Sequence, residues 1–110
     1  MPDPKTAFIP KLTEAQFQQQ VIDLAKLHGY RLIYHTHNSR RSAPGFPDLV
    51  MVSEHRCRAL FRELKTDSGR MSPEQFDWIT SMSLAKLNAG VWRPSDLQSG
   101  RIVKELRGDA

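Results

Sequence analysis

One short stretch, from Gly45 to Lys65, constrains what this chain can fold into more than any other part of the sequence. Gly45 and Pro47 are turn-forming residues, and the apolar, β-branched run after Asp48 predicts a buried strand. Residues 53–57 are polar and fit a hairpin loop of about five residues, and the segment after them predicts the partner strand. The stretch therefore indicates a tight turn followed by a β-hairpin.

The predicted hairpin carries three charged side chains, those of Asp48, Glu63 and Lys65. Side chains alternate across a strand, so Glu63 and Lys65 share one face while Arg62 and Leu64 take the other. A hairpin can bring that face close to Asp48, although the sequence does not fix the register. Burying such charges is costly unless they are paired or bind a metal, and oxygen-rich sites suit hard cations such as magnesium or manganese.

An ordinary solvated ion pair on an edge strand is the competing interpretation of Glu63 and Lys65. E-x-K spacing is common, and exposed ion pairs on strands are routine. The spacing alone leaves both interpretations open. The wider pattern favours the first, because the G-x-P-D turn, the E-x-K strand and Ser72-Pro73-Glu74-Gln75 follow one another in order.

This ordered set resembles the PD-(D/E)-x-K nucleases and looks most like their virus-type replication-repair branch, the VRR-NUC domain. The resemblance runs from about Thr13 to Arg93. It implies a restriction-endonuclease-like core of the α/β (α+β) class, in which a central mixed β-sheet is flanked by helices. The order of elements expected from the sequence, αβββαβ, agrees with that core.

The resemblance also implies the role of each site residue. Asp48 and Glu63, together with the backbone carbonyl of Leu64, would ligate Mg²⁺, with Mn²⁺ as the alternative ion. Lys65 would orient or activate the attacking water and stabilise the developing charge. Two adjacent carboxylates raise the pKa of a lysine, which favours the positioning role over that of a base.

A first helix is predicted to begin at Thr13, which forms a capping box with Gln16, and to end at Gly29. Its inner face repeats at helical spacing through Phe17, Val21, Leu24, Ala25 and His28. Glu14 falls on this buried-facing stripe. One interpretation is a favourable charge at the helix N-terminus. The other comes from the resemblance, in which Glu14 is a third acidic group that assists catalysis and metal binding.

Residues 30–37 predict the first strand, and a polar, basic loop follows it directly before the Asp48 turn. His35 and His37 share a face of that strand, but no third soft ligand follows at a suitable spacing, which argues against a zinc site. We expect the loop to contact DNA phosphates, with an ordinary solvated loop as the alternative. The predicted DNA-binding residues are His37, Asn38, Ser39, Arg40, Arg41 and Arg70.

A second helix is predicted to begin at Ser72, where Gln75 completes another capping box. The resemblance adds a second role, because a glutamine at this place often lies beside the catalytic centre. The apolar residues of this helix are predicted to be core, and they are Phe76, Trp78, Ile79, Met82 and Leu87. We expect the helix to end at 88–90, a short strand at 91–93 and a turn or short helix from 94. The type of the element at 102–106 stays open.

Length and composition suit one soluble, globular domain. The chain has 110 residues, of which 39% are hydrophobic and 25% charged. We expect a partly disordered arm at 1–12, which holds three prolines, and a single domain at 13–110. The sequence shows neither a bilayer-spanning run nor a signal peptide, which favours a cytoplasmic protein. Cys57 is the only cysteine, so an intrachain disulfide is excluded, and we expect no catalytic or metal-binding role for it.

The formal charge of +4 and the pI near 9.6 are compatible with a polyanionic partner. The resemblance implies a Mg²⁺-dependent endodeoxyribonuclease of phage or bacterial origin, acting in DNA repair or recombination. It would be a homodimer that cuts branched DNA such as Holliday junctions. It would need no small-molecule cofactor and would not associate with a membrane. The alternatives are a flap or nicking nuclease of the same fold, a non-catalytic DNA-binding module, and a structural protein with incidental charges.

Overall fold

The structure, a computed structural model, describes residues 11–36 and 43–109. Most of the predicted arm, and the predicted DNA contacts from His37 to Arg41, therefore lie outside the described residues. The helices and strands are, in chain order, α2 (Glu14–Leu27), β1 (Leu32–His35), β2 (Leu49–Ser53), β3 (Arg58–Leu64), α3 (Pro73–Leu84), β4 (Asn88–Trp92), α4 (Pro94–Gln98) and α5 (Arg101–Arg107).

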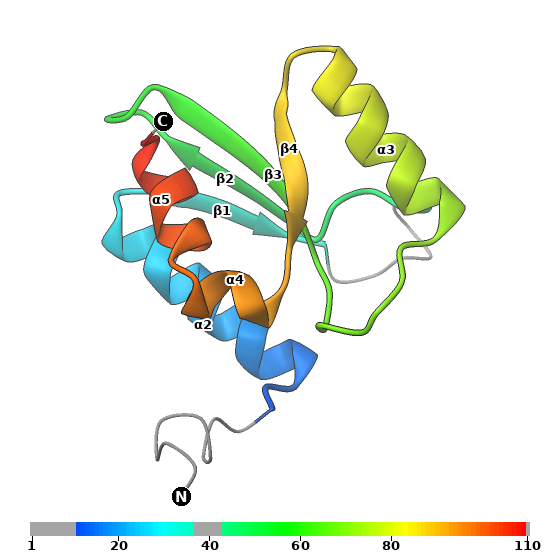
Figure 1. The fold of residues 1–110 in the computed structure, drawn as a ribbon. Coiled ribbons are helices and arrows are strands. Elements are labelled where there is room, and N and C mark those ends of the chain that lie inside the picture. The colour runs from blue at the N-terminus through cyan, green and yellow to red at the C-terminus, as the bar shows by residue number, and fades with distance from the viewer. Residues whose placement is uncertain (1–10, 37–42, 110) are drawn as a thin grey trace, which may run out of the picture.

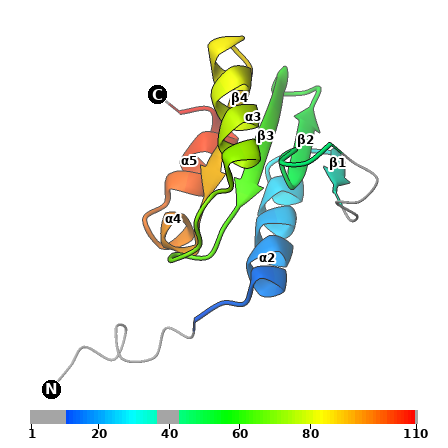
Figure 2. The same cartoon turned by 90° about the vertical axis from the view of Figure 1, so that its right-hand side faces the viewer.

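A four-stranded mixed sheet forms the centre of the molecule. Its strands lie in the order β1-β2-β3-β4. The first three strands are antiparallel, and β4 runs parallel to β3, as a crossover through α3 requires. Helices α2, α4 and α5 lie on one side of the sheet, whereas α3 lies on the other side beside β4 (Figures 1 and 2). The predicted fold class and the order αβββαβ are confirmed, with α4 and α5 added.

The hydrophobic core lies between the sheet and the helices α2 and α5. Phe17, Val21 and Ala25 of α2 are buried there, as the predicted inner face requires. The segment whose type stayed open is helix α5, and its Ile102 and Leu106 are fully buried in the same core. One face of strands β2 and β3 is thus packed in this core, through Leu49, Met51 and Leu60.

Helix α3 differs from its prediction in two respects. It ends at Leu84, since Lys86 takes a left-handed conformation with φ 69° and turns the chain, and residues 88–90 belong to β4. The apolar residues predicted for it are not core as a group, because Met82 is buried whereas Phe76 is 62% exposed, and Leu87, which lies beyond the end of the helix, is 46% exposed. The helix packs mainly on β4, so only one side of it is covered by the rest of the protein.

Strand β1, the single cysteine and the lengths of the helices can be compared with their predictions. The first strand is shorter than residues 30–37, and its Leu32 and Tyr34 are exposed while Ile33 and His35 are half-buried. Cys57 is exposed in the loop between β2 and β3. Within the residues that the structure describes, no helix is long and apolar enough to cross a bilayer.

Candidate active site

Asp48 and Glu63 meet because of the register between β2 and β3. Leu49 pairs with Arg62, so the next residue along each antiparallel strand, Asp48 and Glu63, faces the other. They open onto a cavity of about 220 Å³ at this end of the sheet. Its lining comes from α2, from both strands and from α3, and consists of Glu14, Phe17, Gln18, Asp48, Glu63, Leu64, Lys65 and Gln75.

The Asp48 carboxylate is fixed by the strand opposite it. Its Oδ2 accepts a hydrogen bond from the Leu64 amide at 2.8 Å, and its backbone carbonyl accepts one from the Thr36 amide at 3.0 Å. The position of Asp48 is thus set by the sheet on both sides. For Leu64 the structure shows this use of the amide, and the ligand role expected of its carbonyl stays a prediction.

Glu63 is a buried carboxyl group, only 2% exposed. Its Oε1 accepts a hydrogen bond from Gln75 Nε2 at 3.2 Å, while Oε2 has no hydrogen-bond partner among the described residues. The pKa of Glu63 is raised to about 9, chiefly by burial and also by the neighbouring Asp48 carboxyl, while the charge of Lys65 opposes the rise. A buried oxygen without a hydrogen-bond partner costs folding free energy, so a proton or a bound cation at Glu63 Oε2 would be stabilising.

Gln75 forms the predicted capping box and also contacts Glu63. Its side-chain Oε1 accepts a hydrogen bond from the Ser72 backbone amide at 2.9 Å, and its backbone amide donates one to Ser72 Oγ at 3.1 Å. These two bonds complete the capping box of α3. The other end of the same side chain, Nε2, donates to Glu63. The first turn of α3 is therefore tied directly to the buried carboxyl group.

The turn before Asp48 is locked against that same helix end. Gly45 has φ +86°, and a Cβ atom there would lie 2.4 Å from the carbonyl carbon of Glu74, so only glycine fits. Trp78 Nε1 donates to the Pro44 carbonyl at 3.1 Å, and the Trp78 ring stands edge-on to Phe46 with centroids 5.3 Å apart. The turn and α3 thus form one unit that brings Gln75 and Asp48 to the same cavity.

Lys65 follows β3 and lines the cavity with Glu63, as the predicted alternation requires. Its backbone amide donates to the Trp92 carbonyl at 3.1 Å, which anchors its backbone to β4. In residues 11–36 and 43–109, no ion pair of 4 Å or less involves Lys65. Its ammonium group is therefore not held by a carboxylate and can meet an incoming anion.

The α2 side of the cavity differs partly from the prediction. Glu14 is exposed in the first turn of α2, so its place on the buried stripe is wrong, although it does line the cavity. Its charge contributes to the raised pKa of Glu63. Gln18 was missed by the sequence reasoning, and it lines the cavity with its amide 2.8 Å from His35 Nε2. Its position one helical turn after Glu14 is the signal that could have found it.

The donor set can be tested for its fit to a metal ion. Within the described part of the chain, no group of three or more His, Cys, Asp or Glu side chains comes together closely enough to hold an ion. The two facing carboxyl groups and the unpartnered Glu63 Oε2 nevertheless suit Mg²⁺, which proteins often bind through one or two carboxylates while waters and substrate phosphates fill the remaining positions. The site fits a hard cation and does not fit a closed zinc site.

Of the six predicted DNA contacts, the structure describes one. Arg70 is exposed on the segment between β3 and α3, on the chain that leaves the cavity after Lys65. The prediction for His37, Asn38, Ser39, Arg40 and Arg41 concerns residues outside the described part.

Comparisons with known proteins give three findings. The model of the VRR-NUC domain family matches residues 8–94. A solved structure titled "VRR_NUC domain protein" is similar in fold, with a TM-score of 0.62 and 21% sequence identity over 88% of this chain and 92% of that chain. No match is found among curated proteins.

Proposed function

This chain belongs to the VRR-NUC domain family, and on that premise we propose that it is a metal-dependent nuclease that hydrolyses phosphodiester bonds in DNA. The observation that carries the proposal is the pair of facing carboxyl groups, Asp48 and Glu63, with a buried Glu63 oxygen that lacks a partner. Lys65 and Gln75 line the same cavity. Burying such a cluster of charged and polar groups costs folding free energy, so a purely structural role does not account for it.

Each residue has a defined task in this proposal. Asp48, Glu63 and the Leu64 carbonyl hold Mg²⁺ or Mn²⁺, and Glu14 assists them from α2. The ion, when bound, neutralises the phosphate and lowers the pKa of water. Lys65 orients the attacking water and stabilises the charge that develops on the phosphate.

Gln75 keeps Glu63 in position through its 3.2 Å hydrogen bond. The raised pKa of Glu63 means that its carboxyl group carries a proton at neutral pH in the ion-free protein. Binding of the cation therefore releases that proton.

We propose branched DNA, such as Holliday junctions, as the preferred substrate, with flap cutting or nicking as the alternatives within the same activity. The net charge of +4 supports a polyanionic partner. The proposed setting is DNA repair or recombination in the cytoplasm of a bacterial or phage-infected cell.

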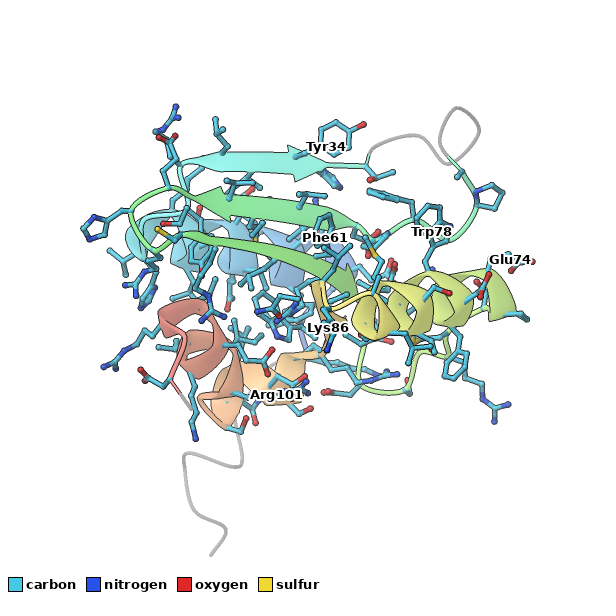
Figure 3. The ribbon with its side chains drawn as sticks, turned by 90° about the horizontal axis from the view of Figure 1, so that it is seen from above. Tyr34, Phe61, Glu74, Trp78, Lys86 and Arg101 are labelled. Carbon is cyan, nitrogen blue, oxygen red and sulfur yellow. The ribbon has the colours of Figure 1, made fainter. Side chains whose placement is uncertain are left out.

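We also propose a homodimer, formed through the face of the sheet away from α2. Leu32 is 49% exposed and Tyr34 is 61% exposed there, beside Val50 and Phe61, which pair in the same row. Figure 3 looks onto this face, with Tyr34 and Phe61 toward the viewer and α2 behind the strands. Because these side chains are uncharged, a second copy of the same face is a better partner for them than a phosphate backbone.

A cleavage assay tests the proposed activity. Labelled four-way junctions, flaps, single strands and linear duplexes are incubated with the protein in Mg²⁺, in Mn²⁺ and in EDTA. We expect paired, symmetric cuts in junctions with either metal and none in EDTA. Cutting of flaps alone would redirect the substrate, whereas no metal-dependent cutting of any substrate would contradict the nuclease.

A non-catalytic DNA-binding module is the second candidate, and one observation favours it. A protonated Glu63, as its raised pKa implies at neutral pH, can exist in the cavity without any ion. Calorimetric titration with Mn²⁺ separates the two candidates. If the protein is a nuclease, the wild type binds Mn²⁺ and the Glu63→Gln variant does not. If it is a plain binding module, neither the wild type nor the variant binds Mn²⁺ at this site.

A further inference from the structure

The side chain of Lys65 is not held in place by a carboxylate. In residues 11–36 and 43–109, no ion pair of 4 Å or less involves its ammonium group. A lysine ammonium sits on a flexible four-carbon stem, and a group that orients a reacting water must be placed accurately. The support for this side chain therefore has to come from what packs against its stem.

A tight turn after β3, residues 66–69, lies against that stem. The Gly69 amide donates to the Thr66 carbonyl at 3.1 Å, which closes the turn. A Cβ atom on Gly69 would lie 3.6 Å from Lys65 Cδ and 2.9 Å from Thr66 Oγ1, so the backbone of Gly69 lies directly beside the lysine side chain. The position of the turn therefore limits where the ammonium group of Lys65 can go.

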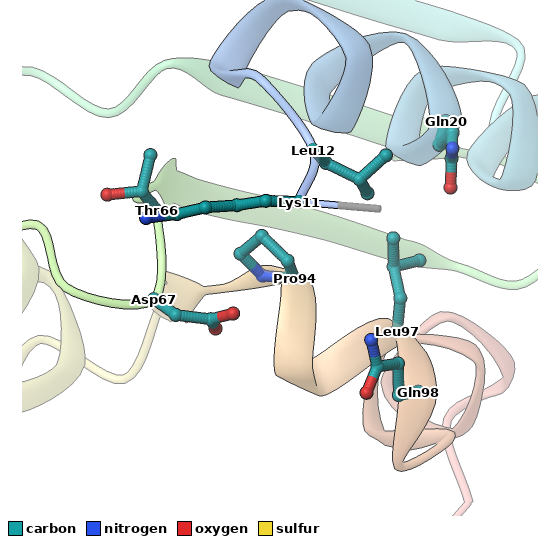
Figure 4. A pocket seen from close by; sticks show the side chains of 8 residues that line it. All are labelled: Lys11, Leu12, Gln20, Thr66, Asp67, Pro94, Leu97 and Gln98. Atoms are coloured by element: carbon teal, nitrogen blue, oxygen red, sulfur yellow. The ribbon is translucent and has the colours of Figure 1, made fainter. Parts of the chain in front are cut away.

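Packing does not hold this turn on all sides. Thr66 and Asp67 line a cavity of about 540 Å³ together with residues of α2, of the segment before α2 and of α4. Figure 4 looks into this cavity and shows Asp67 directed toward the start of α4, beside Pro94. Asp67 and Ser68 are also exposed to solvent. Hydrogen bonds to neighbouring segments are therefore needed to fix the turn.

Arg93 makes two of these hydrogen bonds and contacts both ends of the turn. Its Nη1 donates to the Thr66 carbonyl at 2.6 Å and to the Gly69 carbonyl at 2.7 Å. Hydrogen bonds from a charged donor are roughly twice as strong as those between neutral groups. A third bond runs from the Ser95 amide to Asp67 Oδ1 at 3.0 Å. The turn is thus tied to the start of α4, chiefly by Arg93.

The sheet brings Arg93 to this place. Leu64 of β3 pairs with Trp92 of the parallel strand β4, so Lys65 and Arg93 are the next residues along the two strands. The Lys65 amide donates to the Trp92 carbonyl at 3.1 Å. The Arg93 amide donates to Asp96 Oδ2 at 2.8 Å, which fixes its backbone at the start of α4. Among the described residues, no carboxylate within 4 Å competes for its guanidinium group.

We propose that Arg93 is a positioning residue for the nuclease reaction and acts through Lys65. It holds the turn at residues 66–69 against the stem of Lys65 and thereby keeps the ammonium group in the active-site cavity. This inference rests on the proposed function, in which Lys65 orients the attacking water, and deepens it. A displacement of about 1 Å can slow an enzyme about a hundredfold, so loss of Arg93 should slow cutting and leave DNA binding intact.

A direct contact with a DNA phosphate is the other use of the same positive charge. The geometry favours positioning, because Arg93 is half-buried and its Nη1 already donates to two carbonyl groups. The two roles differ in their effect on binding. A phosphate contact contributes to DNA affinity and to its salt dependence, whereas a residue that acts through Lys65 changes the rate of cutting.

Arg56 offers a matched control. It is also half-buried, and its guanidinium group also donates to two backbone carbonyls, those of His28 at 2.7 Å and Arg107 at 3.2 Å. It lies in the loop between β2 and β3, at the end of β3 remote from Lys65. Arg56→Ala and Arg93→Ala should lower the melting temperature by similar amounts. A change found only in Arg93→Ala therefore does not come from lost stability.

Single-turnover cutting in Mg²⁺ is measured for the wild type and both variants over a range of protein concentrations, and DNA affinity is measured in EDTA. We expect Arg93→Ala to lower the saturating rate about 10–100-fold. Its half-saturating concentration and its affinity in EDTA should equal those of the wild type, and Arg56→Ala should match the wild type throughout. A wild-type saturating rate in Arg93→Ala, or a weakened affinity in EDTA, would overturn the proposal.

Amide hydrogen exchange tests the hold on the turn without any cutting. The Lys65 and Gly69 amides should exchange at least about tenfold faster in Arg93→Ala than in Arg56→Ala, since a hydrogen bond to a charged group contributes that much. Equal exchange in the two variants would overturn the proposal. If exchange changes but the wild type cuts no DNA, the proposed function fails, and with it the catalytic role of Arg93. If the wild type and Arg93→Ala cut equally well, the positioning role fails and the nuclease stands.

Asp67→Ala provides a second variant in case Arg93→Ala does not fold. Asp67 is exposed, and its carboxylate ties the same turn to the Ser95 amide. This variant should also lower the saturating rate without weakening DNA affinity in EDTA. With Arg93→Ala unfolded, a wild-type saturating rate in Asp67→Ala would overturn the proposal.

Discussion

At the scale of single residues, Gln75 shows how one side chain can serve both fold and function. The capping box at Ser72 could be predicted from the sequence, because that motif depends only on residues three apart. The hydrogen bond to Glu63 could be expected only from the family resemblance, since it joins elements that local sequence does not relate. The contact of Gln18 with His35 likewise joins two elements, although the spacing of Gln18 one helical turn after Glu14 is a local signal for its place at the cavity.

The chain offers a matched control for Gln75. Gln16 makes the same capping box with Thr13 in α2 but is not among the residues that line the active-site cavity. Gln75→Ala and Gln16→Ala should each lower the free energy of unfolding by about 1 kcal/mol. Only Gln75→Ala should also slow DNA cutting, by about 10–100-fold. Urea unfolding and single-turnover cutting measure the two effects, and equal cutting rates in the two variants would remove Gln75 from the site.

Glu63 makes the stability of the ion-free protein depend on pH. Its pKa is about 9 in the folded protein and 4.5 ordinarily, so folding favours the protonated form. The stabilising contribution is complete below the ordinary pKa and is lost as the pH rises through the folded value. In EDTA, the melting temperature should therefore fall between about pH 5 and pH 9, and Glu63→Gln should flatten that fall. Parallel curves for the two proteins would show that Glu63 is not responsible.

At the scale of elements, the sequence predicted which elements exist better than what covers them. The β2–β3 hairpin could be predicted because turn residues and an apolar run define it locally. Helix α3 was placed correctly, but its apolar residues were assigned to the core because periodicity cannot tell whether a second layer lies opposite. Its end at Leu84 was also missed, since Lys86 takes the left-handed conformation that usually marks a glycine.

The docking of the Asp48 turn on α3 gives a prediction at this scale. In Gly45→Ala the new Cβ would lie 2.4 Å from the Glu74 backbone, so the turn or the helix must move. We expect a loss of about 2–4 kcal/mol in stability, from the left-handed backbone and the clash together, and much slower cutting. Gly100 has a similar φ of +82° with nothing within 4 Å of its Cβ position, so Gly100→Ala reports the backbone cost alone. An equal loss in both variants would contradict the tight docking.

At the scale of the whole molecule, the C-terminal helices were the least predictable part. Pro94 suggested a short helix, but the segment at 102–106 is too short for its periodicity to decide its type. In the structure α5 completes the core and also supports β3, since Glu105 Oε1 accepts from the buried Arg62 at 3.0 Å and from Trp92 Nε1 at 3.0 Å. The strand that carries Glu63 is thus anchored from the opposite face by residues remote in sequence.

The sheet face that carries Tyr34 and Phe61 is the interface of the proposed homodimer, which gives a prediction about self-association. Tyr34→Lys places a charge on a surface that, in the proposed homodimer, meets its own copy, and the dimer dissociation constant should rise at least tenfold. Leu27→Lys is the control, because Leu27 is 79% exposed on α2, a helix that lies on the other side of the sheet (Figure 2). Sedimentation velocity over a range of protein concentrations measures both. A monomeric wild type, or a Tyr34→Lys variant that dimerises equally well, would contradict this interface.

The central claim is that Asp48, Glu63 and Lys65 form a metal-dependent catalytic site, and one measurement tests it most directly. The single-turnover rate of junction cutting in Mg²⁺ is compared among the wild type, Asp48→Asn and Lys65→Ala, with circular dichroism to verify the fold of each protein. The account predicts cutting by the wild type and rates at least about a hundredfold lower in both variants, with folded structure retained. Either variant cutting at the wild-type rate would contradict it.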